Sequence, residues 1–305
     1  MYGEVFSRVA DLEHVATDMN EHRIMSLVHL LLTGQGCDRG QLREISESIP
    51  DLITRPFRVV LVEIDRFARR RPIERVTASQ LALECVQENL ADHSLHAPLW
   101  MYSGGFAILV TEPLLDIAIS LRTEVQRCIH DASERNRGTT TISVVISDRI
   151  NDVAEAARAF QDCRRAMTHR IRRGPGMLME LDQAQEGARG TFGFPDDLEA
   201  AMIHAVRCQD ADRMANLTDE LLLVGAEWDP NDLRYVAMQI GFSALKDLHR
   251  FIAGGQLGIV SDYRSLVDQL DTAYGRDDLV QWFMRILRVH KASLEQVQSS
   301  KTDKN

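Results

Sequence analysis

Two short stretches of the sequence carry residue types that could do chemistry. Glu63 and Asp65 close an apolar segment and bring two carboxylates to its end. Gly104 and Gly105 stand in the stretch YSGGFAILV, where adjacent glycines can let the backbone approach a phosphate or can supply the positive φ angles of a tight turn. These four residues are the candidate site, and the dipeptide alone does not decide between the two uses of its glycines.

Strands are expected to position these residues. The β-branched, apolar segment FRVVLVEID (57–65) predicts a strand that is buried on both faces. The segments LWMYS (99–103) and FAILVTE (106–112) predict a hairpin around the glycines, and its second arm should be buried because its apolar run has no polar face. Two more strands are predicted at 139–147 and 177–181. Each candidate residue therefore lies at a strand end or in a hairpin turn.

Helices are predicted between these strands. Residues 77–94 should form a helix with Thr77 as its N-cap. The side chains expected on or near its apolar face are Leu81, Leu83, Cys85, Val86 and Leu90. Residues 113–138 begin with Pro and end in Gly, and residues 150–174 end in basic residues that suit the carbonyl end of a helix. The order β-α-β-β-α-β-α-β predicts an α/β (α+β) sandwich of the ferredoxin-like or nucleotidyl-cyclase-palm type.

Both flanks of this sandwich are predicted to be helical. Residues 4–33 have apolar side chains at spacings of three and four and end at Thr33-Gly34-Gln35-Gly36, which indicates an amphipathic helix. This helix either folds back onto the following domain or forms a parallel dimer helix that carries a signal. After residue 190 the strands stop. Helices are then predicted from about Pro195 and at about 210–224, 230–253, 261–272 and 276–295.

These changes in pattern predict four parts of the chain. N-terminal signalling or linker helices occupy 1–54, and the α/β domain occupies 55–185. A helical domain occupies 192–296. The last segment, 297–305, is a polar tail that is expected to be disordered.

Composition excludes several classes of function. The net charge of −10 argues against a broad nucleic-acid-binding face, and no run approaches the roughly 18 apolar residues of a membrane span. Five cysteines stand singly without a CxxC pair, which favours a reducing, cytoplasmic location over a disulfide framework or a zinc site. No Walker loop, GxSxG motif or convincing histidine cluster is present, so we expect no cofactor and no metal.

The candidate site resembles a known domain. The run Glu63-Ile64-Asp65-Arg66-Phe67, followed after about 35 residues by the hairpin 102–109, resembles the GGDEF domain of diguanylate cyclases over about residues 55–182. In that family a similar strand carries a metal-binding acid, and the hairpin bears Gly-Gly-Asp-Glu-Phe. The resemblance carries over Gly104 and Gly105, and it places the acid among Glu63 and Asp65.

This sequence departs from the family where the chemistry is done. Gly105 is followed directly by Phe106, so both hairpin acids are missing. Residues 68–79 also lack the Asn and the Gly-Asp pair that bind guanine in the family. Nucleotidyl condensation needs carboxylates that hold Mg²⁺ over a triphosphate. The resemblance therefore indicates a degenerate GGDEF-like domain without catalysis and with no catalytic, cofactor or metal residues.

The rest of the chain resembles AraC-type regulators of Gram-positive bacteria, in which a degenerate GGDEF-like domain precedes a helical region and a pair of helix-turn-helix units. Residues 30–34 resemble the end of the linker helix, 194–199 the start of the helical region, and 290–304 the lead into the DNA-binding domain. The resemblance implies a cytoplasmic sensory and dimerisation region, a homodimer with no membrane insertion. It would bind DNA only through a helix-turn-helix domain absent from this chain, and a small molecule or nucleotide could be its effector.

Other interpretations remain open. The chain could be a nucleotide-binding or residual diguanylate-cyclase-like enzyme, or an interaction scaffold without a ligand. Glu63 and Asp65 could pair at the surface with Arg66, Arg69 or Arg70, for little stabilisation, or line a retained nucleotide or small-molecule pocket.

Two basic or helical patterns invite a nucleic-acid interpretation. The runs 69–71 and 164–173 lack interleaved aromatic residues, so a solvated face or a helix end is favoured. Residues 233–252 superficially resemble a helix-turn-helix. The nearby acids Asp232 and Asp247 give little positive surface, so a helix or helix pair is favoured there.

Overall fold

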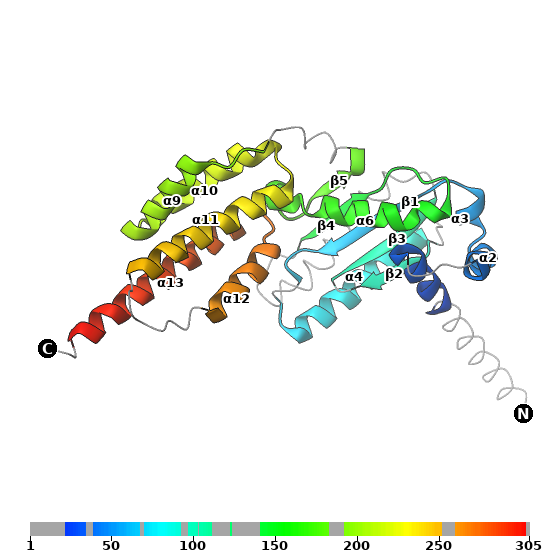
Figure 1. The fold of residues 1–305 in the computed structure, drawn as a ribbon. Coiled ribbons are helices and arrows are strands. Elements are labelled where there is room, and N and C mark those ends of the chain that lie inside the picture. Colours follow the sequence, from blue (N-terminus) through cyan, green and yellow to red (C-terminus); the bar gives the residue numbers. More distant parts are fainter. Residues whose placement is uncertain are drawn as a thin grey trace, which may run out of the picture. The chain divides into compact units, whose positions relative to one another are not determined.

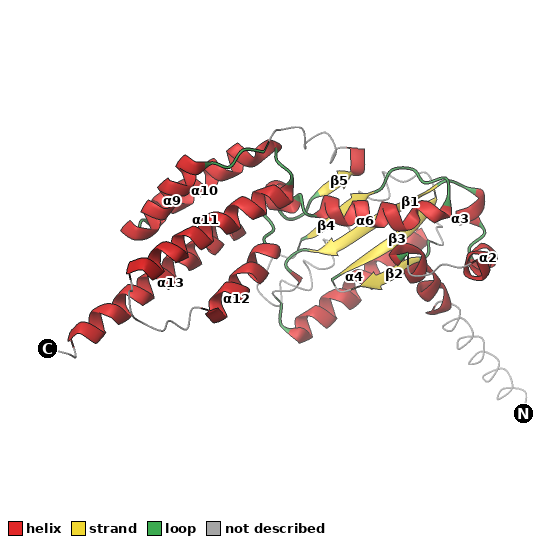
Figure 2. Cartoon of the chain, in the orientation of Figure 1, coloured by secondary structure: helices red, strands yellow, loops and turns green. Residues whose placement is uncertain are grey.

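A computed structural model of the chain describes residues 22–34, 39–67, 70–92, 97–102, 104–111, 123, 141–182, 192–251 and 260–302. The chain divides into two compact units. The first unit comprises Met1–Met167 and Gly176–Asp182, and the second comprises Thr168–Pro175 and Gln183–Asn305. In the described residues, all strands lie in the first unit and the second unit is helical (Figures 1 and 2).

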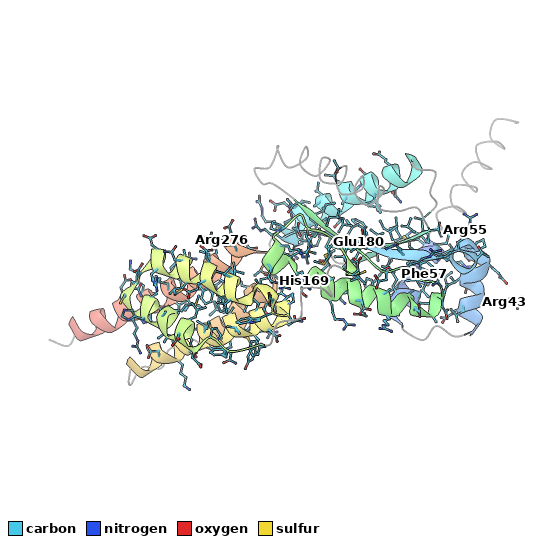
Figure 3. All side chains as sticks on the ribbon, turned by 90° about the horizontal axis from the view of Figure 1, so that it is seen from above. Arg43, Arg55, Phe57, His169, Glu180 and Arg276 are labelled. Atoms are coloured by element: carbon cyan, nitrogen blue, oxygen red, sulfur yellow. The ribbon has the colours of Figure 1, made fainter. Side chains whose placement is uncertain are left out.

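The first unit is built on a five-stranded sheet in the order β2-β3-β1-β4-β5. The central strand β1 (Phe57–Ile64, whose first residue is labelled in Figure 3) pairs antiparallel with β3 (Gly105–Thr111) and β4 (Ile142–Ile146). The edge strand β2 (Leu99–Tyr102) pairs antiparallel with β3, and β5 (Leu178–Glu180) pairs parallel with β4. The first four strands have the ferredoxin-like order, which confirms the predicted α+β fold class. The helix predicted at 113–138 lies outside the described residues apart from position 123.

The helix α4 (Pro72–Asp92) covers one face of the sheet. Its buried positions Ala78, Ala82 and Val86 are spaced by four residues and pack on the alternate side chains of β1, such as Val62. The expected buried face was wrong for Leu81, which is only half-buried, while Leu83 packs at the edge of the cluster.

The N-terminus of α4 also differs from the prediction. Thr77 lies in the second turn, where its hydroxyl donates to the carbonyl of Ile73, so it is not the N-cap. The helix begins five residues earlier, because the Glu74 carboxylate accepts hydrogen bonds from the backbone N–H and the guanidinium of Arg71. These hydrogen bonds lower the pKa of Glu74.

The helix α6 (Ala156–Met167) lies on the opposite face of the sheet (Figures 1 and 3). Its buried residues include Phe160 and Cys163, whose thiol lies 3.9 Å from the carbonyl oxygen of Val59. A short helical turn, η2 (Val153–Glu155), precedes it, and Asp152 caps that turn by accepting from the N–H of Ala154. The helix predicted at 150–174 therefore begins later and breaks after Met167, before the short α7 (Arg170–Arg173).

The described part of the N-terminal helix, 22–33, folds back onto the first unit. Its apolar residues Leu27, Val28, Leu31 and Leu32 are buried. The His29 ring stacks on Trp100 of β2, with centroids 4.7 Å apart. This packing confirms the fold-back alternative for residues 22–34, and residues 4–21 lie outside the described residues. Two short helices, α2 (Arg39–Ser48) and α3 (Asp51–Thr54), lead from it to β1.

The second unit is a bundle of helices around one apolar core. Helices occur close to all five predicted positions. They are α9 (Asp196–Cys208), α10 (Ala211–Val224) with the turn η3 (Gly225–Glu227), α11 (Pro230–Phe251), α12 (Val260–Asp271) and α13 (Arg276–Thr302).

The helices α11 and α13 test two predictions from the sequence. Because α11 is one continuous helix, residues 233–251 do not form a helix-turn-helix. Gly241 lies in the middle of α11, against Trp282 of α13. The helix α13 runs to Thr302, so most of the tail predicted as disordered is helical. None of the described helices is long and apolar enough to cross a membrane.

Candidate functional site

The candidate residues come together where β1 ends. Glu63 lies opposite Gly105 in the β1–β3 ladder, and the N–H of Ile64 donates to the carbonyl of Gly104 at 2.8 Å. Asp65 follows on the same side of the strand as Glu63, and its N–H donates to the carbonyl of Thr141 at 2.9 Å. The structure thus brings the four predicted residues together at the end of β1, beside the start of β3. We call this place the strand-end site.

The two glycines serve the geometry of the hairpin. Gly104 has a φ of +90°, and a Cβ there would lie 3.0 Å from the ring of Phe67. A Cβ on Gly105 would meet the backbone carbonyl oxygen of Val62 and would lie 2.8 Å from the hydroxyl of Tyr102. Only glycine fits either position, so the turn requires both residues whether or not a phosphate ever binds.

Glu63 keeps a half-buried carboxylate at this site. The hydroxyl of Tyr102 donates a hydrogen bond of 2.9 Å to its Oε1 atom. Tyr102 itself packs within an aromatic cluster, with its ring centroid 5.5 Å from Trp100 and 6.2 Å from Phe160. The phenol therefore holds Glu63 against the sheet.

Asp65 is buried, with 2% of its surface exposed. Its Oδ1 accepts a hydrogen bond of 2.8 Å from the hydroxyl of Ser143. Its Oδ2 accepts one of 2.8 Å from the hydroxyl of Thr141 and one of 2.7 Å from the backbone N–H of Gly176. The interpretation of Asp65 as a surface acid is therefore wrong, because the burial of a carboxylate requires internal donors of this kind.

The backbone after Asp65 adopts an uncommon conformation. Arg66 has a φ of +57°, and Gln209 is the other non-glycine residue with a positive φ among the described residues. The chain then places Phe67 over Gly104. The basic run that follows serves the start of α4, through Arg71 and Glu74. Burial lowers the pKa of Arg70.

Sequence analysis missed four residues of the strand-end site: Tyr102, Thr141, Ser143 and Gly176. One signal was available, because Thr141 and Ser143 are two residues apart at the start of a predicted strand and must share a face. Their partner Asp65 is distant in sequence, by 76 residues from Thr141 and 111 from Gly176.

These donors bear on whether the site fits Mg²⁺ and a nucleoside triphosphate. Both oxygens of Asp65 already accept hydrogen bonds from the protein, and the hairpin supplies no acid after Gly105. Glu63 is then the one remaining carboxylate of the four candidate residues, and it is held by Tyr102. One carboxylate is a poor ligand set for a triphosphate-bound metal. No group of three or more potential metal ligands gathers anywhere in the described residues. The residues present do not fit the metal centre of a cyclase.

Comparison with known proteins bears on the first unit. Residues 53–168 match the GGDEF-like domain family. Taken with the five-stranded sheet, this match agrees with the predicted α+β fold that contains a GGDEF-like domain. No curated protein matches the chain significantly.

Two solved structures are similar to the chain at low identity. One is the diguanylate cyclase SiaD from Pseudomonas aeruginosa in complex with its activator SiaC, with 15% identity, a TM-score of 0.32, and coverage of 59% of this chain and 74% of that chain. The other is a regulator of polyketide synthase expression from Bifidobacterium adolescentis, with 14% identity, a TM-score of 0.34, and coverage of 87% and 92%.

Proposed function

We propose that residues 1–305 are the non-catalytic sensory and dimerisation region of a cytoplasmic AraC-type transcription regulator. In this proposal the GGDEF-like unit supports the fold and the relay of a signal, and it makes no cyclic dinucleotide. Contact with DNA belongs to a helix-turn-helix domain outside these residues. The family match over 53–168 and the sequence resemblances on either side of it support this assignment.

The single observation that supports the loss of catalysis best is the environment of Asp65. A carboxylate that accepts hydrogen bonds from Ser143, Thr141 and Gly176 must give them up before it can bind a metal. Three donors would then lose their acceptor, of which the Ser143 hydroxyl is buried and the other two are partly buried. A buried donor left without a partner costs about 1–3 kcal/mol. The site therefore favours a structural use of the acid over a catalytic one.

The packing of the N-terminal helix supports a role in receiving a signal. Its buried side chains join the core of the first unit, and His29 stacks on Trp100. Trp100 in turn lies 5.6 Å, ring to ring, from Phe160 of α6. A displacement of the N-terminal helix would therefore disturb the sheet and α6 directly, as a relay needs.

Incubation of the chain with GTP and Mg²⁺, followed by mass spectrometry, tests the loss of catalysis. We expect unchanged GTP and no guanine dinucleotide, in the wild type and in Glu63→Ala alike. A dinucleotide product that disappears in Glu63→Ala would overturn the proposal and favour a residual cyclase.

Electrophoretic mobility shift with the same 305 residues tests the assignment of DNA binding. We expect no site-specific complex, because the stretch that superficially resembles a helix-turn-helix lies within one continuous helix, α11. Strong, sequence-specific binding by this chain alone would contradict the proposal. Sedimentation equilibrium checks the homodimer, for which a purely monomeric chain at micromolar concentration is the opposing result.

A further inference from the structure

A short segment between α6 and β5 belongs to the other unit. Residues Thr168–Pro175 group with the helical unit, although Met167 before them and Gly176 after them belong to the first unit. We call these eight residues the inserted segment. It contains α7, and Ile171 of that helix is fully buried in the core of the helical unit. The chain therefore passes from the first unit into the second and back within eight residues.

Polar contacts also hold the inserted segment in the helical unit. Arg170 is 7% exposed, and its guanidinium lies over the ring of Tyr274, 4.4 Å from the centroid. Arg172 donates to the carbonyl of Ala226. Arg172 also donates to Nδ1 of His169, which is labelled in Figure 3. The sequence favoured a solvated face or a helix end for this basic run. Arg170 lies in the helix α7 and is buried, so the solvated-face alternative is wrong for this residue.

The end of the inserted segment lies against the main chain of the helical unit. A Cβ on Gly275 would lie 3.2 Å from the Cα of Gly174 and 3.6 Å from Pro175. The N–H of Gly174 donates to the carbonyl of Arg170 at 2.8 Å, which closes the turn of α7. Gly174 is thus fixed from the side of the helical unit.

The next anchor along the chain belongs to the strand-end site. The N–H of Gly176 donates to Oδ2 of Asp65 at 2.7 Å. The N–H of Met177 donates to the hydroxyl of Ser143 at 3.2 Å, and its carbonyl accepts from Val144 at 2.7 Å. Asp65 and its serine partner therefore fix the residues at which the chain returns to the first unit.

A single residue, Pro175, separates these two anchors. Successive Cα atoms are 3.8 Å apart, so Gly174 and Gly176 cannot be more than about 7.6 Å apart. The proline ring also fixes φ at Pro175, which removes one of the few torsions that could absorb a displacement. Because the link is this short, a displacement of one anchor by more than a few ångströms must move the other.

We propose that Asp65 acts as a latch that couples the strand-end site to the helical unit through the inserted segment. One of the two strand-end acids would hold a main-chain N–H. Any event that withdraws the carboxylate from Gly176 would loosen residues 168–175 within the core around Ile171. This inference goes beyond the proposed function, because it holds for any effector and any output.

Hydrogen exchange of the full chain, read by mass spectrometry, tests the latch, since amide exchange reports local opening. Asp65→Leu keeps much of the volume of the side chain and removes both acceptor oxygens, so the N–H of Gly176 loses its acceptor. We expect amides within 168–174 to exchange about tenfold faster in this variant. The matched control is Val145→Ala, which removes volume from a buried position of β4 without changing Asp65. Unchanged exchange in 168–174, or equal acceleration in the control at equal global stability, would overturn the proposal.

The reverse experiment tests the same coupling even where Asp65→Leu does not fold. Coupling is reciprocal, so Ile171→Ala in the helical unit should accelerate exchange at Gly176 and Met177 in the first unit. Leu217→Ala removes apolar volume from the same helical core without altering the inserted segment, and it should leave those two amides unchanged. Equal behaviour of the two variants at matched stability would contradict the latch.

Discussion

Two glycines, one in each unit, are confined in different ways. A Cβ on Gly105, in β3, would meet the backbone carbonyl of Val62 in the paired strand. A Cβ on Gly241, in α11, would meet the ring of Trp282 and the Cδ1 atom of Ile286, both on α13. The atom that would block a Cβ at Gly105 belongs to the main chain of a hydrogen-bonded ladder. The atoms that would block a Cβ at Gly241 are the outer atoms of side chains. At Gly105 the neighbour that excludes a side chain is thus backbone, whereas at Gly241 it is side chain.

The polar groups also differ between the two units, in the kind of acceptor that they use. In the strand-end site the backbone N–H of Gly176 binds Asp65. In the helical unit the side chain of Gln209 donates to Nδ1 of His290, and that of Arg172 donates to Nδ1 of His169. A backbone donor does not titrate and is removed only by substitution with proline, whereas a histidine acceptor can be replaced or protonated. The four predictions below test these differences, beginning with the largest effect.

Gly105→Ala should have the largest effect, a loss of about 3 kcal/mol or more in the free energy of unfolding. The added methyl cannot fit unless the β1–β3 ladder shifts. Urea denaturation followed by circular dichroism measures the loss, and the fluorescence of Trp100 reports the same unit. A loss under about 1 kcal/mol would show that the ladder adjusts, and the contrast between the two units would then be wrong.

Gly241→Ala should cost less, about 1–2 kcal/mol, because Trp282 and Ile286 can change rotamer and because alanine favours a helix. The same denaturation measurement applies, with the fluorescence of Trp282 as the local probe. Trp282→Phe should partly restore the variant by making room, at the expense of the hydrogen bond from Trp282 to the carbonyl of Leu266. If the double variant Gly241→Ala, Trp282→Phe is no more stable than Gly241→Ala, the indole of Trp282 is not what obstructs the added methyl group.

Acid should weaken the helical unit through His169. Burial, with help from Arg172 and Arg173, lowers the pKa of His169 to about 4 in the folded chain, against 6.5 when unfolded. The unfolded state therefore takes up the proton first. The contribution to stability is complete above about pH 6.5 and is lost as the pH falls toward 4, by about 1 kcal/mol between pH 7 and pH 5 for this partly solvated ring.

His169→Asn is the control for this pH dependence, since an amide oxygen can accept from Arg172 without titrating. The slope of stability against pH between 7 and 5 should fall in this variant. A smaller slope should persist, because burial also lowers the pKa of His290. An unchanged slope of stability against pH in His169→Asn would mean that groups other than His169 cause the acid sensitivity.

Tyr102→Phe should have the smallest effect. It removes one side-chain hydrogen bond, to the half-buried Glu63, and leaves every backbone bond of the strand-end site in place. We expect a loss of about 0.5–1 kcal/mol. A loss as large as that of Gly105→Ala would mean that side chains, and not the main chain, hold this site together.

The sequence predicted the strands well because their signal is local. The β-branched runs at 57–65 and 139–147 contain β1 and β4, and the Gly-Gly turn lies between β2 and β3 as expected. Helix ends were less predictable. Thr77 has the chemistry of an N-cap, yet Pro72 and the Arg71–Glu74 pair begin α4 earlier. The predicted domain boundaries at 185 and 192 stay predictions.

The sequence predicted where the candidate site lies, but it did not predict what its residues do. The spacing of Glu63, Asp65 and the glycines predicts where they meet, because each stands at a strand end. The burial of Asp65 depends on donors that are 76 to 111 residues away along the chain, and no local pattern encodes such pairs. No local pattern in the basic residues around Ile171 predicts that this side chain is buried in the core of the helical unit.

The pairing register of β3 has a consequence for how such a hairpin can lose its acids. Compared with Gly-Gly-Asp-Glu-Phe, this chain has two residues fewer between Gly105 and the phenylalanine. Side chains along a strand alternate between the faces of a sheet, so a difference of two leaves Phe106, Ile108 and Val110 facing the α4 core. A difference of one would turn this apolar set to the opposite face. A hairpin of this kind can therefore be shorter by two residues and keep the same side chains in the core, whereas a hairpin shorter by one cannot.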